Sequence, residues 1–368
     1  MKVMTILGTR PEIIRLSRVI ELLDSQCQHI LVHSGQNYDA NLSDLFFQEM
    51  RVRKPDEFLG VRAATAGAQI AQVIERSEQV LLSHKPDRLL ILGDVNTGYS
   101  AVVAARMGIP VFHMEAGNRC YDDRVPEEIN RRIIDHSSTI LMPYTERAME
   151  NLVREGIERE RIFITGNPIF EVLERYRQEI DGGGALQRLG VSAGSYFLVT
   201  MHRSENVDEP IRVEMLLAAL SAVAEEYGLP MIVSVHPRTA DKLERFSLTP
   251  DSKRVLLVPA MGFFDFVQLE KNARVVLSDS GTVQEECAIF GVPNVTIRDV
   301  TERPETIECG SNILSGPHVE DVLRAVRTAL ALGSDWTAPV EYTAPKVART
   351  VAKILLGYHS LRRHYTTL

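Results

Sequence analysis

The sequence has few cysteines, and none of them forms a recognisable metal or disulfide motif. Cys27, Cys120, Cys287 and Cys309 are far apart in the 368 residues and make no CxxC pair. This spacing argues against a zinc cluster or a disulfide framework. Cys120 has no nearby cysteine partner, so we interpret it as a small packing residue rather than a nucleophile.

The sequence also lacks a long apolar run and an excess of positive charge. It opens on the strand-like Lys2 to Leu7 and has no signal-peptide or membrane-helix stretch, so we expect a cytoplasmic protein that does not bind membranes. Asp and Glu outnumber Lys and Arg by 49 to 41, which gives a formal net charge of −8. Nucleic acid is therefore not an expected partner, and any anionic ligand needs a local pocket.

A dinucleotide fingerprint is missing as well. The first strand runs into Gly8-Thr9-Arg10-Pro11-Glu12 and then into a helical pattern, without GxGxxG. A strand, a tight turn and a helix still present a helix N-terminus to a phosphate or carboxylate. We interpret Arg10 at this turn as a clamp for an anionic substrate.

Strands and helices alternate along the whole chain, which predicts a doubly wound α/β architecture. The expected strands include Arg161 to Thr165 in the first half and Met231 to Val235 in the second. The length favours two domains, and the flexible Asp181-Gly182-Gly183-Gly184 marks the boundary. We predict a Rossmann-like domain at 1–180 that carries acid/base residues and a second at 185–350. A C-terminal helix at about 351–368 is expected to pack back on the first domain.

The stretch from His113 to Arg131 carries many opposed charges directly after an apolar strand. Such a loop fits a surface laced with weak ion pairs or the acid, base and clamps of an α/β enzyme. Two observations favour the enzyme: Glu115 continues the strand, and Gly117 frees the backbone where the chain must turn outward. Pro126 with Glu127 and Glu128 then fits the first turn of a helix. Asp94 also ends a strand, so it either caps the next helix or faces the same crevice as Glu115.

The second half repeats this pattern with different residues. His202 follows the strand at 195–200, and Ser280-Gly281-Thr282 begins a helix after another strand. Free backbone N–H groups at a helix start bind anions, although Ser280 fits a plain N-cap equally well. A histidine is more often packed or exposed than catalytic, but His202 stands beside Arg203 at a strand end. Together these residues predict a phosphorylated or nucleotide-linked substrate.

An ordered set of motifs covers nearly the whole chain and carries a family resemblance. The motifs are GTRPE at 8–12, GD at 93–94, EAG-R at 115–119, PEE-NR at 126–131, TGN at 165–167, HR-E at 202–205, DSG--QEE at 279–286 and RD-TERPE at 298–305. The set resembles the non-hydrolysing UDP-N-acetylglucosamine 2-epimerases. The resemblance implies a glycosyltransferase-B-like fold, an active site in the cleft between the domains, a UDP-sugar substrate and a homodimer.

The resemblance also implies roles for individual residues. The implied catalytic residues are Asp94, Glu115, Glu127 and His202. The implied substrate-binding residues are Arg10, Arg15, Asn118, Arg119, Met261, Ser280, Gly281, Thr282, Glu286 and Arg303. Arg15 is a departure, because the family often has Lys there.

The chemistry of the family explains this choice of residue types. The C2 proton of a pyranose is not next to a carbonyl, so its direct removal lacks an electron sink. Expelling UDP from C1 while a carboxylate takes the C2 proton gives a glycal, and re-addition with protonation from the other face inverts C2. This route needs an acid, a base and cations for the leaving diphosphate, but neither NAD nor a metal. The order of Asp94, Glu115 and Glu127 in the proton transfers stays open, and His202 is assigned to the leaving UDP.

Departures from the common family pattern narrow the expected substrate. This chain has Asn118 within EAGNR, Ser204 in the HRSE loop and Gln36-Asn37-Tyr38 where others have QHR. It is most similar to the branch that converts UDP-2-acetamido-2,6-dideoxy-L-talose to UDP-N-acetyl-L-fucosamine for capsule or O-antigen lipopolysaccharide synthesis. The alternatives are a UDP-N-acetylglucosamine 2-epimerase that makes UDP-N-acetylmannosamine, a glycosyltransferase of the same fold, a hydrolysing epimerase and a silent sensor. Ser204 also puts in doubt the activation of the bacterial glucosamine enzymes at a second UDP-sugar site.

Overall fold

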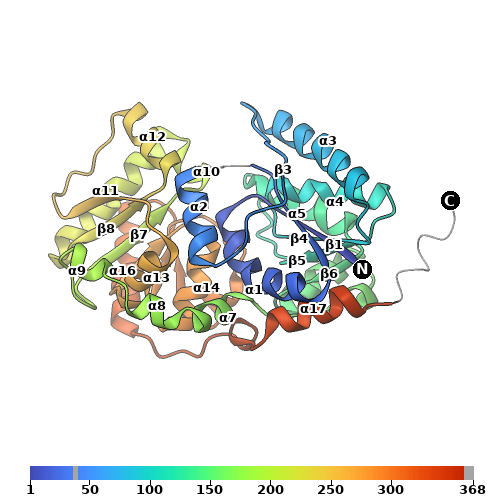
Figure 1. Ribbon diagram of the computed structural model, residues 1–368. Helices are drawn as coiled ribbons and strands as arrows, with labels where there is room; N and C mark the ends of the chain where they lie inside the picture. Colours follow the sequence, from blue (N-terminus) through green and yellow to red (C-terminus); the bar gives the residue numbers. More distant parts are fainter. Residues whose placement is uncertain (36–39, 360–368) are drawn as a thin grey trace. The chain divides into compact units, whose positions relative to one another are not determined.

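The computed structural model describes residues 1–35 and 40–359. Gln36, Asn37 and Tyr38, and the chain after His359, lie outside the described residues. The chain divides into two compact units, which Figure 1 colours along the sequence. The N-terminal unit comprises Met1–Arg175 with the segment that starts at Glu341, and the C-terminal unit comprises Tyr176–Val340.

The N-terminal unit is built on six parallel strands in the order β3-β2-β1-β4-β5-β6. The strands are β1 (Lys2–Leu7), β2 (Gln28–His33), β3 (Glu57–Phe58), β4 (Arg88–Leu92), β5 (Val111–Met114) and β6 (Ile140–Met142). The central strands are continuous apolar runs because helices cover both faces of a parallel sheet. Residues 3 to 7 of β1 and all of β5 are buried.

Helices connect these strands and close the unit. They are α1 (Arg10–Gln26), α2 (Ala40–Glu49), α3 (Ala66–His84), α4 (Ser100–Arg106), α5 (Pro126–Ser137), α6 (Glu146–Arg154), α7 (Ile169–Arg175) and α17 (Val347–Gly357). The last helix, α17, packs against α1 and runs beside it in Figure 1. Arg88 secures this end of the chain by donating to the carbonyls of Leu355 and Tyr358.

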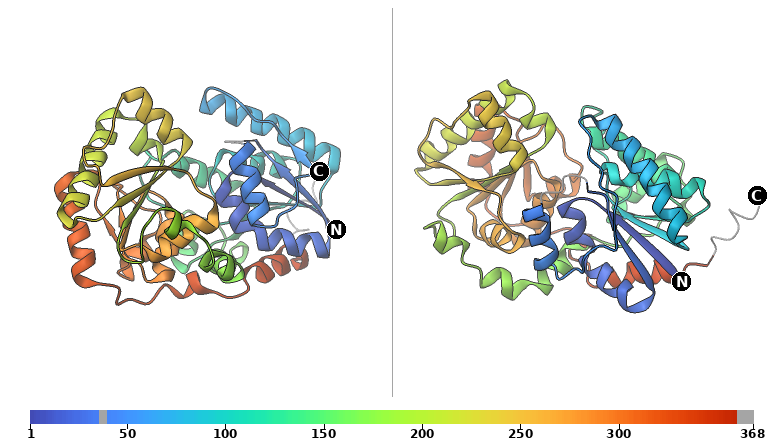
Figure 2. Two further views of the ribbon diagram at one scale, coloured as in Figure 1. Left: turned by 60° about the vertical axis from the view of Figure 1, so that its left-hand side comes forward. Right: turned by 45° about the horizontal axis from the view of Figure 1, so that its top comes forward.

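The C-terminal unit repeats the same winding with its own six parallel strands, in the order β12-β11-β10-β7-β8-β9. They are β7 (Phe197–Met201), β8 (Met231–Val235), β9 (Val255–Pro259), β10 (Val275–Ser278), β11 (Asn294–Thr296) and β12 (Asn312–Leu314). Its longer helices are α11 (Pro210–Tyr227), α12 (Pro237–Phe246), α13 (Phe263–Asn272), α14 (Gly281–Phe290) and α16 (Val319–Leu332). The two views of Figure 2 show helices on both faces of each sheet.

The strand orders confirm the predicted fold class of two doubly wound α/β domains. In such sheets ligands bind outside the carboxyl ends of the strands, where the winding reverses direction. The reversal falls between β1 and β4 in the N-terminal unit and between β7 and β10 in the C-terminal unit. The sequence motifs at Gly8, Gly93, His202 and Asp279 therefore follow the four strands that flank the two reversal points.

One predicted strand does not form. Residues 161–165 make only an isolated bridge, between Leu141 and Ile162, after a short 3-10 helix. The neighbouring strand β6 is only three residues long, and the Arg161 side chain takes the carbonyls of Ser138 and Thr139. The apolar run at 161–165 therefore packs beside the sheet without extending it. No helix within the described ranges is both long and apolar enough to span a membrane.

Candidate active site

Glu115 occupies a strained position at the carboxyl end of β5. Its φ is 63°, in the left-handed region that costs a residue with a Cβ about 1–2 kcal/mol. Gly117 completes the turn with φ 81°, and a Cβ there would lie 2.2 Å from the Ala148 carbonyl oxygen. The turn buries the Glu115 carboxylate, which is 9% exposed.

Three side chains hold the Glu115 carboxylate. Arg15 on α1 forms a buried ion pair with it, and the Tyr144 hydroxyl donates to the same oxygen, Oε2, at 3.3 Å. The Asn118 amide donates to Oε1 at 3.4 Å. The Arg15 guanidinium also lies over the Tyr144 ring, 5.7 Å from its centre. Arg15 is therefore a partner of the predicted acid/base carboxylate, as well as a position at which the family resemblance implies UDP binding.

Asp94 lies at the end of β4, the strand paired with β5. Arg131 on α5 binds Oδ2 of Asp94 through two nitrogens, Nε at 2.8 Å and Nη2 at 2.7 Å. The Asp94 backbone carbonyl accepts a bond from the Asn130 amide at 2.9 Å. Asp94 and Glu115 therefore stand at adjacent strand ends, each held by an arginine from a helix.

Helix α5 begins at Pro126, as the sequence predicts, and places two glutamates in its first turn. Glu128 is fully buried and accepts bonds from the backbone N–H groups of Cys120 and Tyr121 and from Arg131. Burial opposes ionisation, but these donors hold the pKa of Glu128 below its ordinary value. Glu127 is half-buried, so of the pair it is the one with surface left for a ligand.

Arg119, for which the resemblance implies substrate binding, has a buried and paired side chain. Its side chain is 0% exposed and binds Asp135 at 2.8 Å and Glu155 through two bonds of 2.8 and 2.6 Å. Asp135 also lies 2.9 Å from the ring of His113. Although burial opposes ionisation, His113 and Arg119 keep the pKa of Asp135 below its usual range. Arg119 therefore ties the loop after β5 to Asp135 and Glu155 through buried ion pairs.

The turn before α1 is held by its own glutamate. The backbone N–H groups of Gly8 and Thr9 donate to Glu12 Oε2 at 3.0 and 2.8 Å, which forms a capping box at the helix start. Burial raises the pKa of Glu12 to about 8. Arg10 projects from the same turn, with its guanidinium 5.6 Å from the centre of the Phe46 ring.

In the C-terminal unit, His202 follows β7 and is oriented by a buried carboxylate. Asp279, at the end of β10, accepts bonds from the backbone N–H groups of His202 and Arg203 and from the Asn206 amide at 2.9 to 3.1 Å. Its Oδ1 lies 3.2 Å from His202 Nδ1. Burial opposes ionisation, but His202 and the backbone donors hold the pKa of Asp279 well below its usual range. The His202 ring is 36% exposed, so Nε2 faces away from Asp279 with access to a ligand.

Helix α14 starts directly after Asp279. Ser280 is its N-cap residue, but the Ser280 hydroxyl makes no capping hydrogen bond. Gly281 is closely packed, since a Cβ there would lie 3.0 Å from Glu302 Oε1. Thr282 is half-buried in the first turn. The helix start thus keeps the N-terminal geometry that suits an anion.

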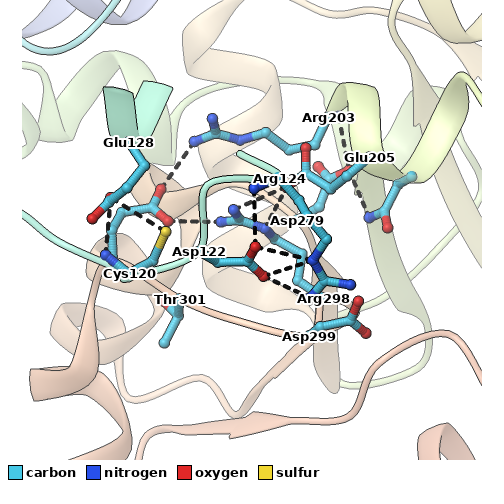
Figure 3. A network of polar contacts seen from close by, with 12 residues as sticks. Cys120, Asp122, Arg124, Glu128, Arg203, Glu205, Asp279, Arg298, Asp299 and Thr301 are labelled. Atoms are coloured by element: carbon cyan, nitrogen blue, oxygen red, sulfur yellow. Dashed lines mark hydrogen bonds and ion pairs between the residues drawn. The ribbon is translucent and has the colours of Figure 1, made fainter. Parts of the chain in front are cut away.

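Ion pairs also link Arg298 and Arg203 to glutamates of the C-terminal unit, and Figure 3 draws part of this network. Arg298 binds Glu205 at 2.9 and 3.0 Å and Glu302 at 2.8 Å, and Arg203 binds Glu302 at 3.0 Å. Within the N-terminal unit the same figure shows Glu128 bound to Cys120, and Asp122 bound to Arg124. The Arg124 and Asp122 side chains lie 2.6 Å apart.

The remaining predicted ligand residues differ in what they contact. Arg303 is buried and pairs with the fully buried Glu285, and its Nη1 bonds the Glu302 carbonyl at 3.3 Å. Glu286, one residue further along α14, is 3% exposed and lies beside Glu270. Met261 is half-buried and packs on the apolar cluster between α13, α14 and the sheet.

The sequence did not identify the side chains that bind and orient the predicted site residues. Arg131 grips Asp94, Tyr144 contacts Glu115, Asp279 orients His202 and Glu270 contacts Glu286. Arg131 and Asp279 stood inside quoted motifs, so their spacing was a usable signal. Tyr144 and Glu270 stand outside every motif, and only the folded chain brings them to their partners.

Comparison with known proteins gives a consistent result over most of the chain. A family model described as UDP-N-acetylglucosamine 2-epimerase matches residues 21–356. A UDP-N-acetylglucosamine 2-epimerase of Methanocaldococcus jannaschii is 40% identical over 92% of this chain and 95% of its own length. A UDP-2,3-diacetamido-2,3-dideoxy-D-glucuronate 2-epimerase of Pseudomonas aeruginosa is 35% identical over 90% of this chain and 92% of its own length.

A solved structure shows the same likeness in three dimensions. It is the Methanocaldococcus jannaschii UDP-GlcNAc 2-epimerase in complex with UDP-GlcNAc and UDP, with a TM-score of 0.92 and 39% identity. The alignment covers 97% of this chain and 99% of that one. Neither the matched family description nor these relatives single out the L-fucosamine branch.

Proposed function

Because this chain belongs to the UDP-N-acetylglucosamine 2-epimerase family, we propose that it inverts C2 of UDP-N-acetylglucosamine by eliminating and re-adding UDP. The relatives are named as epimerases, which are isomerases, and the chain is an enzyme of this class. The substrate and the mechanism are the proposed parts. The epimerase relative from Methanocaldococcus jannaschii, at 40% identity, supports the N-acetylglucosamine compound as the first substrate to test.

One observation carries the mechanism. Asp94 and Glu115 end adjacent parallel strands, and each is held by an arginine, Arg131 and Arg15. Proton transfer at C2 needs carboxylates fixed within reach of the sugar, because misplaced groups lose most of their effect. The strained backbone of Glu115 fits a residue whose position matters more than its conformational cost. Glu127, half-buried in the first turn of α5, is the third member of the proposed acid/base group.

The proposed steps balance without an external reactant. One carboxylate takes the C2 proton as the C1–O bond to UDP breaks, which leaves a C1–C2 double bond. UDP then adds back to C1 while an acid protonates C2 from the opposite face. We assign His202 and the start of α14 to the departing diphosphate, because an imidazole held by Asp279 and a helix N-terminus both stabilise negative charge.

A second substrate has a specific observation in its favour. Asn118 donates to the Glu115 carboxylate, so the residue that departs from the family pattern touches the proposed acid/base group. This contact supports a sugar with altered substituents, and UDP-2-acetamido-2,6-dideoxy-L-talose is the candidate that the sequence favours. The diacetamido-glucuronate relative is a precedent for altered sugars in this family.

NMR in deuterated water tests both substrates. UDP-N-acetylglucosamine and the L-talose compound are incubated separately with the protein, and C2 configuration, deuterium at C2 and free UDP are followed. Conversion of UDP-N-acetylglucosamine with deuterium at C2 supports the proposal, and conversion of only the L-talose compound transfers it to the second substrate. Release of UDP with free sugar would indicate a hydrolysing epimerase. If both substrates bind and neither exchanges its C2 proton, the proposed epimerase reaction is refuted.

The homodimer expected from the resemblance is also a proposal. Ile129 and Ile133 lie one turn apart on α5 and are 47% and 38% exposed, and Leu82 on α3 is 56% exposed. Helices α3 and α5 both pack on α4, and exposed apolar side chains suit burial between two copies. Light scattering after size exclusion tests this, with Ile129→Glu expected to shift the mass from two chains to one.

A further inference from the structure

The pair of glutamates inside the C-terminal unit is unusual in its surroundings. Glu270 on α13 is 0% exposed, and Glu286 on α14 is 3% exposed. Their carboxyl groups are close enough to hydrogen bond. Two ionised carboxylates in contact in a buried place repel each other and lose hydration, so one of them keeps a proton.

The hydrogen bonds around Glu270 identify which carboxyl keeps it. The Cys287 thiol lies 3.4 Å from Oε1 and donates to it. Burial raises the pKa of the Cys287 thiol, so this donor stays protonated. Among the described residues, no donor reaches the other oxygen, Oε2, which is buried. A buried carboxylate oxygen that no donor reaches costs folding free energy. The same oxygen avoids this cost when it carries a proton and donates a hydrogen bond.

The charges near Glu270 agree with this assignment. Glu286 and Cys287 face it from α14, and Asn294 on β11 reaches the Cys287 sulfur at 4.0 Å. Lys271, the next residue on α13, is turned outward to Asp181 at 2.6 Å. Burial and then the charge of Glu286 raise the pKa of Glu270 well above its ordinary value. By contrast Glu285, the other buried glutamate of α14, is paired with Arg303.

We propose that Glu270 is a positioning residue that remains a neutral carboxylic acid and donates its proton to Glu286, which fixes the Glu286 carboxylate as an acceptor for hydroxyl groups of the nucleotide. The second half of this statement rests on the proposed function, in which Glu286 contacts UDP. A carboxylate only accepts hydrogen bonds, so it suits the ribose hydroxyls of UDP and would repel the diphosphate. A hydrogen bond from Glu270 to one Glu286 oxygen fixes the orientation of the carboxylate plane. The second Glu286 oxygen is then positioned to accept a hydrogen bond from the nucleotide.

The test uses three variants of the full chain. Glu270→Gln keeps a donor at the same place without a titratable proton, and Glu270→Met keeps the volume but removes the donor. Gln268→Met is the matched control, because Gln268 is a buried polar residue of the same helix that bonds Gly183 and Ala185. The control measures the effect of lost buried hydrogen bonds on α13 in general.

Infrared difference spectra of the ligand-free proteins report on the proton. At neutral pH we expect C=O absorption from buried carboxylic acids in the wild type, and Glu12 contributes to it because its pKa is about 8. The part of this absorption that belongs to Glu270 should be lost in both Glu270 variants and kept in the Gln268→Met control. Absorption that is unchanged in both Glu270 variants would overturn the proposal, whatever the enzyme does with substrates.

Calorimetric titration with UDP reports on the role of the proton. Loss of the donor in Glu270→Met is expected to raise the Kd for UDP about tenfold. Glu270→Gln should recover affinity to within about twofold, and Gln268→Met should bind like the wild type. Equal weakening in Glu270→Gln and Glu270→Met, or wild-type affinity in Glu270→Met, would overturn the positioning role. Lack of epimerisation with these results intact would count against the proposed function alone.

Discussion

Asp279 should be the most sensitive carboxylate of the C-terminal unit. It is fully buried and accepts from two backbone N–H groups and the Asn206 amide, besides pairing with His202. In Asp279→Asn the amide oxygen can replace Oδ2 and keep these three donors. The amide nitrogen then takes the place of Oδ1, where it faces His202 Nδ1 and the His202 backbone N–H. Two donors, the amide and the backbone N–H, then face each other. We expect a loss of about 2 kcal/mol in unfolding free energy, the scale of one buried charge-assisted bond.

The same substitution should also affect catalysis through His202. The new amide donates to His202 Nδ1 at the place where Asp279 accepted, so the imidazole can no longer carry a proton there. Charge on the ring is then disfavoured, and assistance to the leaving diphosphate weakens. Turnover should fall about 10²-fold, at the lower end of what general acid catalysis contributes, while the KM for the UDP-sugar changes less.

Urea unfolding and steady-state kinetics measure the two effects, with Asp299→Asn as the control. Asp299 makes the same kind of pair with Arg212 at 3.1 Å, but its side chain is 37% exposed, so its loss should cost under about 0.5 kcal/mol. The folded-state pKa of Asp279 is depressed, so its stabilisation is present above the unfolded pKa of about 4 and fades as the pH falls below it. The stability gap between wild type and Asp279→Asn should therefore persist from pH 7 to 5 and narrow only in stronger acid. Equal urea midpoints for the two variants would refute this reasoning.

Four further outcomes are expected. Glu115→Gln should keep its fold, judged by circular dichroism, and lose at least about 10²-fold in turnover. Gly117→Ala should lower the free energy of unfolding by about 2–4 kcal/mol more than Gly156→Ala does. Both glycines have positive φ, but only at Gly117 would a Cβ meet a backbone oxygen. Equal losses of stability in urea would contradict this steric explanation. The pKa of Glu12 is raised to about 8, so its ionisation destabilises the fold as the pH rises from about 4.5 to 8, and Glu12→Gln should flatten that slope in urea midpoints. Treatment with EDTA should leave turnover unchanged in the NMR assay, and a loss restored by a divalent cation would contradict the metal-free route.

The sequence predicted the long apolar strands well and the short ones poorly. The predicted strand Met231 to Val235 has those bounds in the structure. The strands β3, β11 and β12 have two or three residues each and were not predicted. Periodicity over so few residues carries little information, and pairing to a neighbouring strand decides whether they form. At 161–165 the same weakness produced the opposite error, because this apolar run makes only an isolated bridge to β6.

The positions of the site residues were easier to predict than their partners. Strand ends can be read from where an apolar run stops, so Asp94, Glu115 and His202 were found as candidates. The resemblance implies substrate binding by Arg119, and the sequence does not show that Asp135 and Glu155 converge on its guanidinium. Such contacts join residues 16 and 36 positions away, and only the packing of α5 and α6 against the loop creates them.

The two units use one arrangement to hold a reactive group at the reversal point of a sheet. In the C-terminal unit the partner of His202 comes from the neighbouring strand end, so β7 supplies the exposed group and β10 the buried acceptor beneath it. In the N-terminal unit the candidate carboxylates Asp94 and Glu115 stand at the ends of β4 and β5, and helices α5 and α1 supply the arginines. Carboxylates proposed to exchange protons need a fixed cation, whereas a histidine proposed to meet a diphosphate needs a fixed anion behind it. The sign of each buried partner therefore follows from the charge that the proposed reaction brings to the candidate residue.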